Sequence, residues 1–126
     1  INIKFDEDDN YQIIGYPNEL GQAILNIIKN AEDALVENNS INRKINLSLK
    51  QNKEKIILTI SDNAGGIPAE IIYKIFDPYF STKEAKNGTG LGLYMTKMII
   101  DKHMGAKLIV QNNNNGAEFI ILFNRK

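Results

Sequence analysis

Two neighbouring strand-like segments limit most strongly what this chain can fold into. At residues 44–50 every second side chain is apolar (Ile45, Leu47 and Leu49), and residues 55–61 resemble a second strand after a polar turn at 51–54. Alternation of this kind is typical of a strand with one buried face, because successive side chains point to opposite sides of a sheet. Strands joined by so short a turn run antiparallel. The centre of the chain therefore predicts part of a largely antiparallel sheet.

Longer segments on either side have the helical period instead. Residues 19–36 repeat apolar side chains every three or four positions, at Leu20, Ile24, Ile27, Ile28, Ala31 and Leu35. Residues 91–104 form the second predicted helix, and Gly105 suits the position just after its end. A short helical stretch is expected at 69–75.

The remaining strands complete the predicted fold. We expect a hairpin from residues 1–6 and 11–16, and strands at 107–111 and 117–123 joined through a run of asparagines that ends in the turn-forming pair Asn115-Gly116. The sum is an α+β fold, a two-layer sandwich with a mixed, mostly antiparallel β-sheet and about three helices on one face. No repeat or internal boundary divides residues 1–126, so a single domain is expected.

Composition excludes several classes of protein. The chain has 126 residues, 43% of them apolar, which suits one globular domain and not a disordered tail. Fifteen basic and fifteen acidic residues cancel, and no basic stripe suggests nucleic-acid binding. There is no cysteine and only one histidine, His103, so thiol and histidine metal sites are not expected. The apolar runs are too short to span a membrane. We expect a cytoplasmic domain without direct membrane contact. Because the chain starts at Ile1, we also expect a fragment whose parent protein could be membrane-anchored.

The first candidate site lies on the first long helix. Asn26, Asn30 and Asp33 cluster to one side of its apolar stripe, and the spacing of four brings the two amides onto one face. An amide oxygen is a hard, neutral ligand that suits Mg²⁺. Taken alone, two solvated asparagines are the commoner interpretation.

The second candidate is the turn at residues 62–67, which follows a predicted strand. The Asp62 carboxylate could accept a hydrogen bond from the amine of adenine, while Gly65 and Gly66 let the backbone approach the base. Such turns are also common as plain loops.

The third candidate is the run Gly88, Thr89, Gly90, Leu91 and Gly92 at the start of the second long helix. Free backbone N–H groups at a helix start can bind phosphate. The run is neither a P-loop nor a dinucleotide fingerprint, because no Gly-Lys-Ser/Thr and no preceding strand is present. Taken alone, a cluster of glycines is weak evidence for a phosphate site.

Taken together and in this order, the motifs resemble the GHKL (Bergerat-fold) superfamily and, within it, the catalytic domains of histidine kinases. The matching segments are the N box (26–31), the G1 box (62–66), the F box (75–80), the G2 box (88–93) and the closing strand signature (115–119). They cover nearly the whole chain.

This resemblance implies a Mg²⁺ and ATP site. It assigns Mg²⁺ coordination to Asn30 and adenine recognition to Asp62, with Gly66 and Ile67 beside the base. The phosphate contacts it implies are Gly88, Thr89, Gly90, Leu91 and Gly92. The loop at 77–90 resembles the mobile ATP lid, from which Lys83 or Lys86 could reach a phosphate.

The N box also separates branches of the superfamily. Gyrase-like, mismatch-repair and chaperone ATPases resemble this helix but have Glu where this chain has Asn26. An amide cannot act as a general base, so the resemblance favours a kinase over an ATPase. It implies transfer of the γ-phosphate to a histidine on a separate helical dimerisation domain, and from there to a response regulator. The catalytic candidates are Asn26, Asn30 and Lys83.

Two alternatives from other classes remain open. One is a free-standing GHKL serine kinase of the anti-sigma-factor type, against which Asn26 counts. The other is a non-catalytic nucleotide-binding or docking module. The chain departs from the family pattern at Ala34, Ala64 and Ala117, where an aromatic residue, glycine and threonine are common.

Other residues have plainer interpretations. We expect Lys29 to be a solvated charge, and Phe76 and Phe80 to pack in the core or hold the lid rather than take part in catalysis. His103 lies in the last turn of a predicted helix, where an imidazolium suits the helix dipole. It is not expected to be the phosphoacceptor.

Overall fold

The computed structural model of the chain describes residues 2–5, 15–39, 41–78, 80 and 92–125. Its strands are β1 (Asn2–Phe5), β2 (Ile45–Gln51), β3 (Lys55–Asp62), β4 (Lys107–Asn112) and β5 (Ala117–Asn124). Its helical elements are α1 (Pro17–Glu37), the 3₁₀ turn η1 (Ile72–Lys74), α2 (Gly92–Met98) and the π-helical turn η3 (Ile99–His103). None of the helices in these described residues is both long and apolar enough to cross a membrane.

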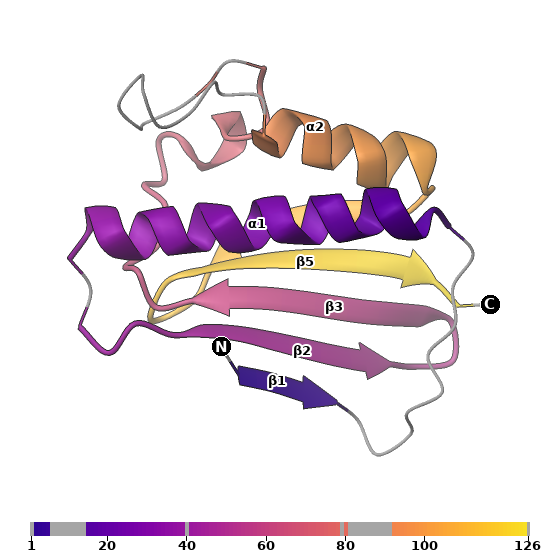
Figure 1. The fold of residues 1–126 in the computed structure, drawn as a ribbon, viewed down its shortest axis with the longest axis horizontal. Coiled ribbons are helices and arrows are strands. Elements are labelled where there is room, and N and C mark those ends of the chain that lie inside the picture. The colour runs from indigo at the N-terminus through magenta and orange to yellow at the C-terminus, as the bar shows by residue number, and fades with distance from the viewer. Residues whose placement is uncertain (1, 6–14, 40, 79, 81–91, 126) are drawn as a thin grey trace.

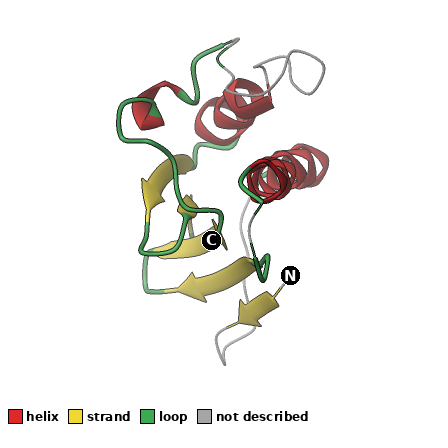
Figure 2. Cartoon of the chain, turned by 90° about the vertical axis from the view of Figure 1, so that its left-hand side faces the viewer, coloured by secondary structure: helices red, strands yellow, loops and turns green. Residues whose placement is uncertain are grey.

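The five strands form one mixed sheet in the order β1-β2-β3-β5-β4 (Figure 1). The β1–β2 pair is parallel and the other three pairs are antiparallel. Figure 2, turned by 90° from this view, shows the sheet as one layer with α1 lying beside it as a second. The predicted α+β class and the mostly antiparallel sheet are therefore confirmed.

Helix α1 begins two residues earlier than its apolar pattern predicted. Pro17 occupies its first turn, where the fixed φ of proline suits a helix and its missing N–H removes no intrahelical bond. The helix ends at Glu37, and the Asn38 N–H donates to the Ala34 carbonyl at 3.0 Å. The face that packs on the sheet is apolar and buried, with Ala23, Ile27, Ala31 and Leu35.

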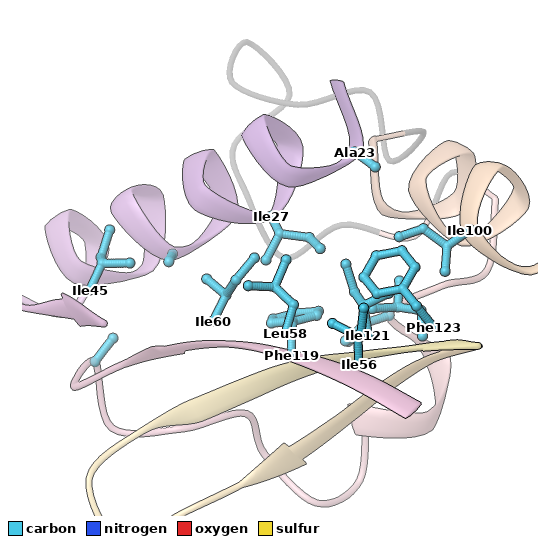
Figure 3. Packing of buried hydrophobic residues seen from close by; sticks show 14 of the residues in the cluster. Ala23, Ile27, Ile45, Ile56, Leu58, Ile60, Ile100, Phe119, Ile121 and Phe123 are labelled. Carbon is cyan, nitrogen blue, oxygen red and sulfur yellow. The ribbon is translucent and has the colours of Figure 1, made fainter. Parts of the chain in front are cut away.

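A single core lies between the helices and the sheet. Along β3 every second side chain is buried, and Ile56, Leu58 and Ile60 point toward the helices. They meet Ile27 of α1 and Ile100 of η3 in Figure 3. Phe119, Ile121 and Phe123 of β5 extend the same core, as the period of two requires. This packing fixes α1 and α2 next to the strand ends that hold the candidate site.

The second long helix changes form before its end. From Gly92 to Met98 it is α-helical, but its last turn, Ile99–His103, is π-helical, and the Met104 N–H donates to the Ile99 carbonyl at 3.0 Å. Gly105 follows with φ of 63°, the left-handed conformation expected after a helix end. The predicted stop at Gly105 is confirmed, whereas the widened turn was not foreseen.

Two other predicted elements, the helical stretch at 69–75 and the first hairpin, have different outcomes. The helical stretch at 69–75 reduces to the single turn η1, because most of its backbone hydrogen bonds span three residues, such as Lys74 N–H to the Ile71 carbonyl, and do not continue as an α-helix. The second strand of the expected first hairpin falls mostly outside the described residues. Its first strand is β1, which pairs with β2 in parallel.

Candidate functional site

The amide of Asn26 joins α1 to the start of α2. Its Nδ2 donates to the Thr96 hydroxyl at 3.3 Å, and its Oδ1 accepts a hydrogen bond from Gln22 at 3.2 Å. Thr96 is fully buried and donates in turn to the Gly92 carbonyl at 2.8 Å. A buried hydroxyl with both a donor and an acceptor is stable in the core. Asn26 therefore fixes the position of Gly92, the last residue of the predicted phosphate-binding run, relative to α1.

Asn30 lies one helical turn further along the same side of α1. Its side chain is half-buried, and within the described residues no hydrogen bond ends on its amide. A half-buried amide of this kind can hydrogen-bond to water or to a ligand. Its neighbour Lys29 is 72% exposed and lies 3.5 Å from Asp33, so it is a surface charge, as predicted.

Asp62, the last residue of β3, is only 7% exposed. Its Oδ1 accepts hydrogen bonds from the Ala64 N–H at 3.0 Å and the Ala117 N–H at 3.3 Å. Two backbone donors hold one oxygen in place and compensate part of the cost of burying the carboxylate. Among the described residues both hydrogen bonds to this carboxylate end on Oδ1, which leaves its second oxygen open to a ligand.

The start of β5 approaches Asp62 very closely. A Cβ added to Gly116 would lie 2.1 Å from the Asp62 carbonyl oxygen and 2.6 Å from its Oδ1. No side chain fits there, so glycine is required by sterics. Ala117, the next residue, is buried and supplies the second N–H to Asp62. The beginning of β5 thus forms one wall of the pocket around the carboxylate.

The turn at residues 62–67 follows Asp62 directly. Gly65 and Gly66 have φ of 97° and 89°, a region that side chains rarely adopt. Asn38 at the end of α1 donates to the Ala64 carbonyl at 2.7 Å. Helix α1 therefore contacts both α2, which begins at Gly92, and this turn.

Phe76 and Phe80 of the 75–80 segment pack against the core, as predicted. The Phe76 ring meets the Phe119 ring edge-on, with centroids 6.2 Å apart and an interplanar angle of 81°. The ammonium of Lys97 lies 5.3 Å from the Phe76 centroid and pairs with Asp101 at 2.6 Å. Phe80 also packs against the core cluster. These contacts attach the 75–80 segment to α2 and β5.

The remaining candidates divide into two groups. Gly92 is exposed at the start of α2, whereas Lys83, Lys86, Gly88, Thr89, Gly90 and Leu91 lie outside the described residues. His103 is exposed on η3, where its Nδ1 lies 3.0 Å from a carboxylate oxygen of Glu19.

Two residues of the site had no sequence signal. Thr96 is a buried polar residue in an otherwise amphipathic helix, and Asn112 contacts the 62–67 turn from the end of β4. Their partners lie 70 and 45 residues away. Local periodicity says nothing about such distances, so only the fold could identify either residue.

The side chains of the site fit a nucleotide with its metal. Among the described residues no cluster of three His, Cys, Asp or Glu side chains could hold a metal ion by itself. Mg²⁺ in nucleotide enzymes is held by only one or two protein ligands together with phosphates. The half-buried amide of Asn30 fits that role, and the free oxygen of Asp62 fits a single neutral donor such as an amine.

Comparisons with known proteins identify the family of this chain. Residues 15–126 match the family described as histidine kinase-, DNA gyrase B-, and HSP90-like ATPase. Sporulation kinase A of Bacillus subtilis is 32% identical over 95% of this chain, which covers 19% of that protein. The two-component sensor PprA of Pseudomonas aeruginosa is 36% identical over 85% of this chain and 12% of its own length. The chain thus spans less than a fifth of these relatives.

Solved structures show the same fold. The catalytic domain of the histidine kinase ThkA, in a nucleotide-free form, matches 98% of this chain and 80% of its own with a TM-score of 0.80 and 27% identity. The kinase relatives, the family match and this shared fold converge on one assignment. The chain belongs to the family of histidine kinase-, DNA gyrase B- and HSP90-like ATPases, and its fold is that of a histidine kinase catalytic domain.

Proposed function

We propose that residues 1–126 form a single catalytic domain that binds Mg²⁺ and ATP and donates the γ-phosphate to a histidine on a separate helical dimerisation domain. The observation that supports this most directly is the carboxylate of Asp62. It is almost fully buried, and two backbone N–H groups hold one of its oxygens. A buried carboxylate with an available oxygen beside a glycine turn is suited to recognise adenine.

At the base, Asp62 accepts a hydrogen bond from the exocyclic amine through its free oxygen. Gly66 and Ile67 lie beside the ring, where the absence of a Cβ at Gly66 lets the backbone come close. An adenine is preferred over a guanine in this arrangement, because guanine presents a carbonyl oxygen to the carboxylate and two acceptors repel.

At the phosphates, Asn30 is the protein ligand for the metal. When bound, Mg²⁺ neutralises charge on the β- and γ-phosphates. The backbone N–H groups at residues 88–92 bind phosphate oxygens at the start of α2, and Lys83 adds a positive charge from the lid. The hydrogen bonds from Asn26 to Thr96 and from Thr96 to Gly92 support this arrangement, because they hold α2 against α1, the helix that carries Asn30.

The nature of residue 26 favours transfer over hydrolysis. An amide in this place cannot take a proton from water, and the Asn26 amide already hydrogen-bonds Gln22 and Thr96. ATP is held intact until an acceptor imidazole attacks. A nitrogen–phosphorus bond then forms, the bond between the γ-phosphorus and its bridging oxygen breaks, and ADP leaves with the electron pair. The phosphohistidine domain passes the phosphoryl group to a response regulator, and the reaction takes place in the cytoplasm.

Titration calorimetry with a non-hydrolysable ATP analogue tests the proposal. Asp62→Asn keeps the size of the side chain but replaces an acceptor with a donor, so affinity should fall at least tenfold with or without Mg²⁺. Asn30→Ala should remove the dependence of affinity on Mg²⁺ and leave metal-free binding unchanged. Glu32→Ala, an exposed change on α1 near Asn30, is the control and should bind like wild type.

The opposite result is equally clear. If the folded wild-type domain shows no saturable binding at millimolar analogue, the kinase proposal is wrong and the chain is a docking module with this fold. If Asp62→Asn binds as tightly as wild type, the assignment of the adenine contact is wrong.

A further inference from the structure

The run of asparagines at 112–115 has a structural role that its sequence does not suggest. In the sequence it only joins two strands. In the fold, it lies against the 62–67 turn, on which adenine recognition depends.

Asn112, the last residue of β4, makes two hydrogen bonds to a single residue of that turn. Its Oδ1 accepts from the Ile67 N–H at 2.8 Å, and its Nδ2 donates to the Ile67 carbonyl at 2.8 Å. A side-chain amide that pairs with both the N–H and the carbonyl of one residue makes the same two hydrogen bonds that a neighbouring strand would make. It holds the Ile67 peptide groups in one orientation although no strand continues there.

The fit between Asn112 and the turn is close. A Cβ added to Gly66 would lie 2.9 Å from the Asn112 Oδ1, so only glycine lets the amide approach this near. The φ of 89° at Gly66 brings the next residue, Ile67, toward Asn112. Glycine at this position therefore serves the contact with Asn112 as well as the approach of a ligand.

Two further bonds hold the same turn from different elements. The Gly65 N–H donates to the Asn115 carbonyl at 3.1 Å, and Asn38 donates to the Ala64 carbonyl at 2.7 Å. Three of the four residues at 64–67 thus have a backbone group fixed from outside the turn. A segment with two adjacent glycines would otherwise sample many conformations.

The asparagine run is itself held in place. The Asn113 Oδ1 accepts from the Asn115 N–H at 2.8 Å and from the Gly116 N–H at 2.7 Å, and its own N–H donates to the Gly116 carbonyl at 2.8 Å. Residues 112–116 are therefore a rigid support attached to β4 and β5.

We propose that Asn112 is a positioning residue for adenine: its amide fixes the 62–67 turn in its binding conformation before the nucleotide arrives. The inference rests on the proposed nucleotide function of the site. Without the amide, the turn must be ordered at the moment of binding, which lowers affinity. The loss of one or two hydrogen bonds to the turn should weaken binding about tenfold. Because the turn contacts only the base, the loss of affinity should be equal for ATP and adenosine.

The test compares Asn112→Ala with Asn114→Ala, a control in the same run whose side chain is exposed and makes no hydrogen bond within the described residues. Binding of adenosine and of a non-hydrolysable ATP analogue is measured at a temperature at which circular dichroism shows every variant to be folded. We expect both affinities to fall about tenfold in Asn112→Ala, with an unchanged effect of Mg²⁺, and neither to change in Asn114→Ala. Asn112→Asp, which keeps the acceptor but loses the donor, should also bind more weakly than wild type.

Amide hydrogen exchange of the ligand-free protein provides a second readout. The Ile67 N–H should exchange faster in Asn112→Ala than in wild type or Asn114→Ala. Wild-type affinity in a folded Asn112→Ala would overturn the inference, as would an affinity loss confined to ATP. If wild-type protein binds neither ligand, the nucleotide function fails, and the positioning role falls with it. Exchange at Ile67 then still reports whether Asn112 holds the turn.

Discussion

Gly116→Ala is the smallest change that should damage the site and the fold together. The added methyl group would lie 2.1 Å from the Asp62 carbonyl oxygen, 2.8 Å from its carbonyl carbon and 2.6 Å from its Oδ1. Two of these atoms are backbone at the end of β3, where Asp62 pairs with Ile45 of β2, and the third accepts hydrogen bonds from Ala64 and Ala117. Moving them would disturb the β2–β3 pairing or those bonds.

The size of the effect follows from that crowding. Forcing a methyl group into a well-packed site costs about 1–3 kcal/mol, and the upper end applies because the colliding atoms are backbone. For a domain of this length each kcal/mol lowers the melting temperature by roughly 3–5 °C. We therefore expect a decrease of about 5–15 °C. The displaced carboxylate should also weaken binding of an ATP analogue.

Gly21→Ala is the matched control. It adds the same methyl group inside α1, at an exposed position with no atom within 4 Å of the new Cβ. Alanine should stabilise the helix by about 0.5–1 kcal/mol. Urea unfolding and calorimetric titration of both variants complete the comparison. If Gly116→Ala unfolds at the wild-type urea concentration and binds the analogue normally, our account of the contact between β5 and Asp62 is wrong.

Two further predictions concern the helices. Ile27→Ala leaves a cavity at a fully buried position of α1. It should lower the free energy of unfolding, measured in urea, by about 2–5 kcal/mol. A loss below about 1 kcal/mol would contradict the packing in Figure 3. Thr96→Val keeps the shape of the side chain but leaves the half-buried Asn26 amide without its acceptor, so we expect a loss of about 1–2 kcal/mol. Thr96→Ser should recover part of this stability, and equal unfolding midpoints for the valine and wild-type proteins would refute the role of the hydroxyl.

Local pattern located most of the elements. The alternation at 44–50 and the strand-like segment at 55–61 became β2 and β3 within one or two residues, because the period of side chains on a strand is independent of what the strand pairs with. The apolar stripe of 19–36 became α1, lengthened by two residues at its start and by Glu37 at its end. The position of Asp62 directly after a predicted strand also marked it as a candidate, and the fold buries it at the end of β3.

The spacing of apolar residues predicted local structure less well where contacts with other parts of the chain change the form of a helix. The stretch at 69–75 has helical spacing but forms only η1, since most of its backbone hydrogen bonds span three residues and do not continue as an α-helix. The π-helical turn η3 likewise lies just before β4 and is bonded to it. Asp101 in that turn accepts from the Leu108 N–H at 3.0 Å, and Lys97 donates to the Leu108 carbonyl at 2.9 Å. These bonds attach the widened turn to β4, which no periodicity could indicate.

Asn26 illustrates the difference between a residue type and its surroundings. The sequence shows an amide where related ATPases have a glutamate, and that fact alone excludes a general base at this position. Only the fold shows that the amide joins α1 to Thr96.

The sequence by itself determined the periodic elements, the α+β class and the residue types of the site, because each depends on local spacing or on the chemistry of single side chains. The tertiary structure decided that β1 joins β2 in parallel, that Gly116 lies against Asp62 and that Asn112 holds Ile67. These contacts join segments far apart in the chain, and they form only when burial of the shared core brings those segments together.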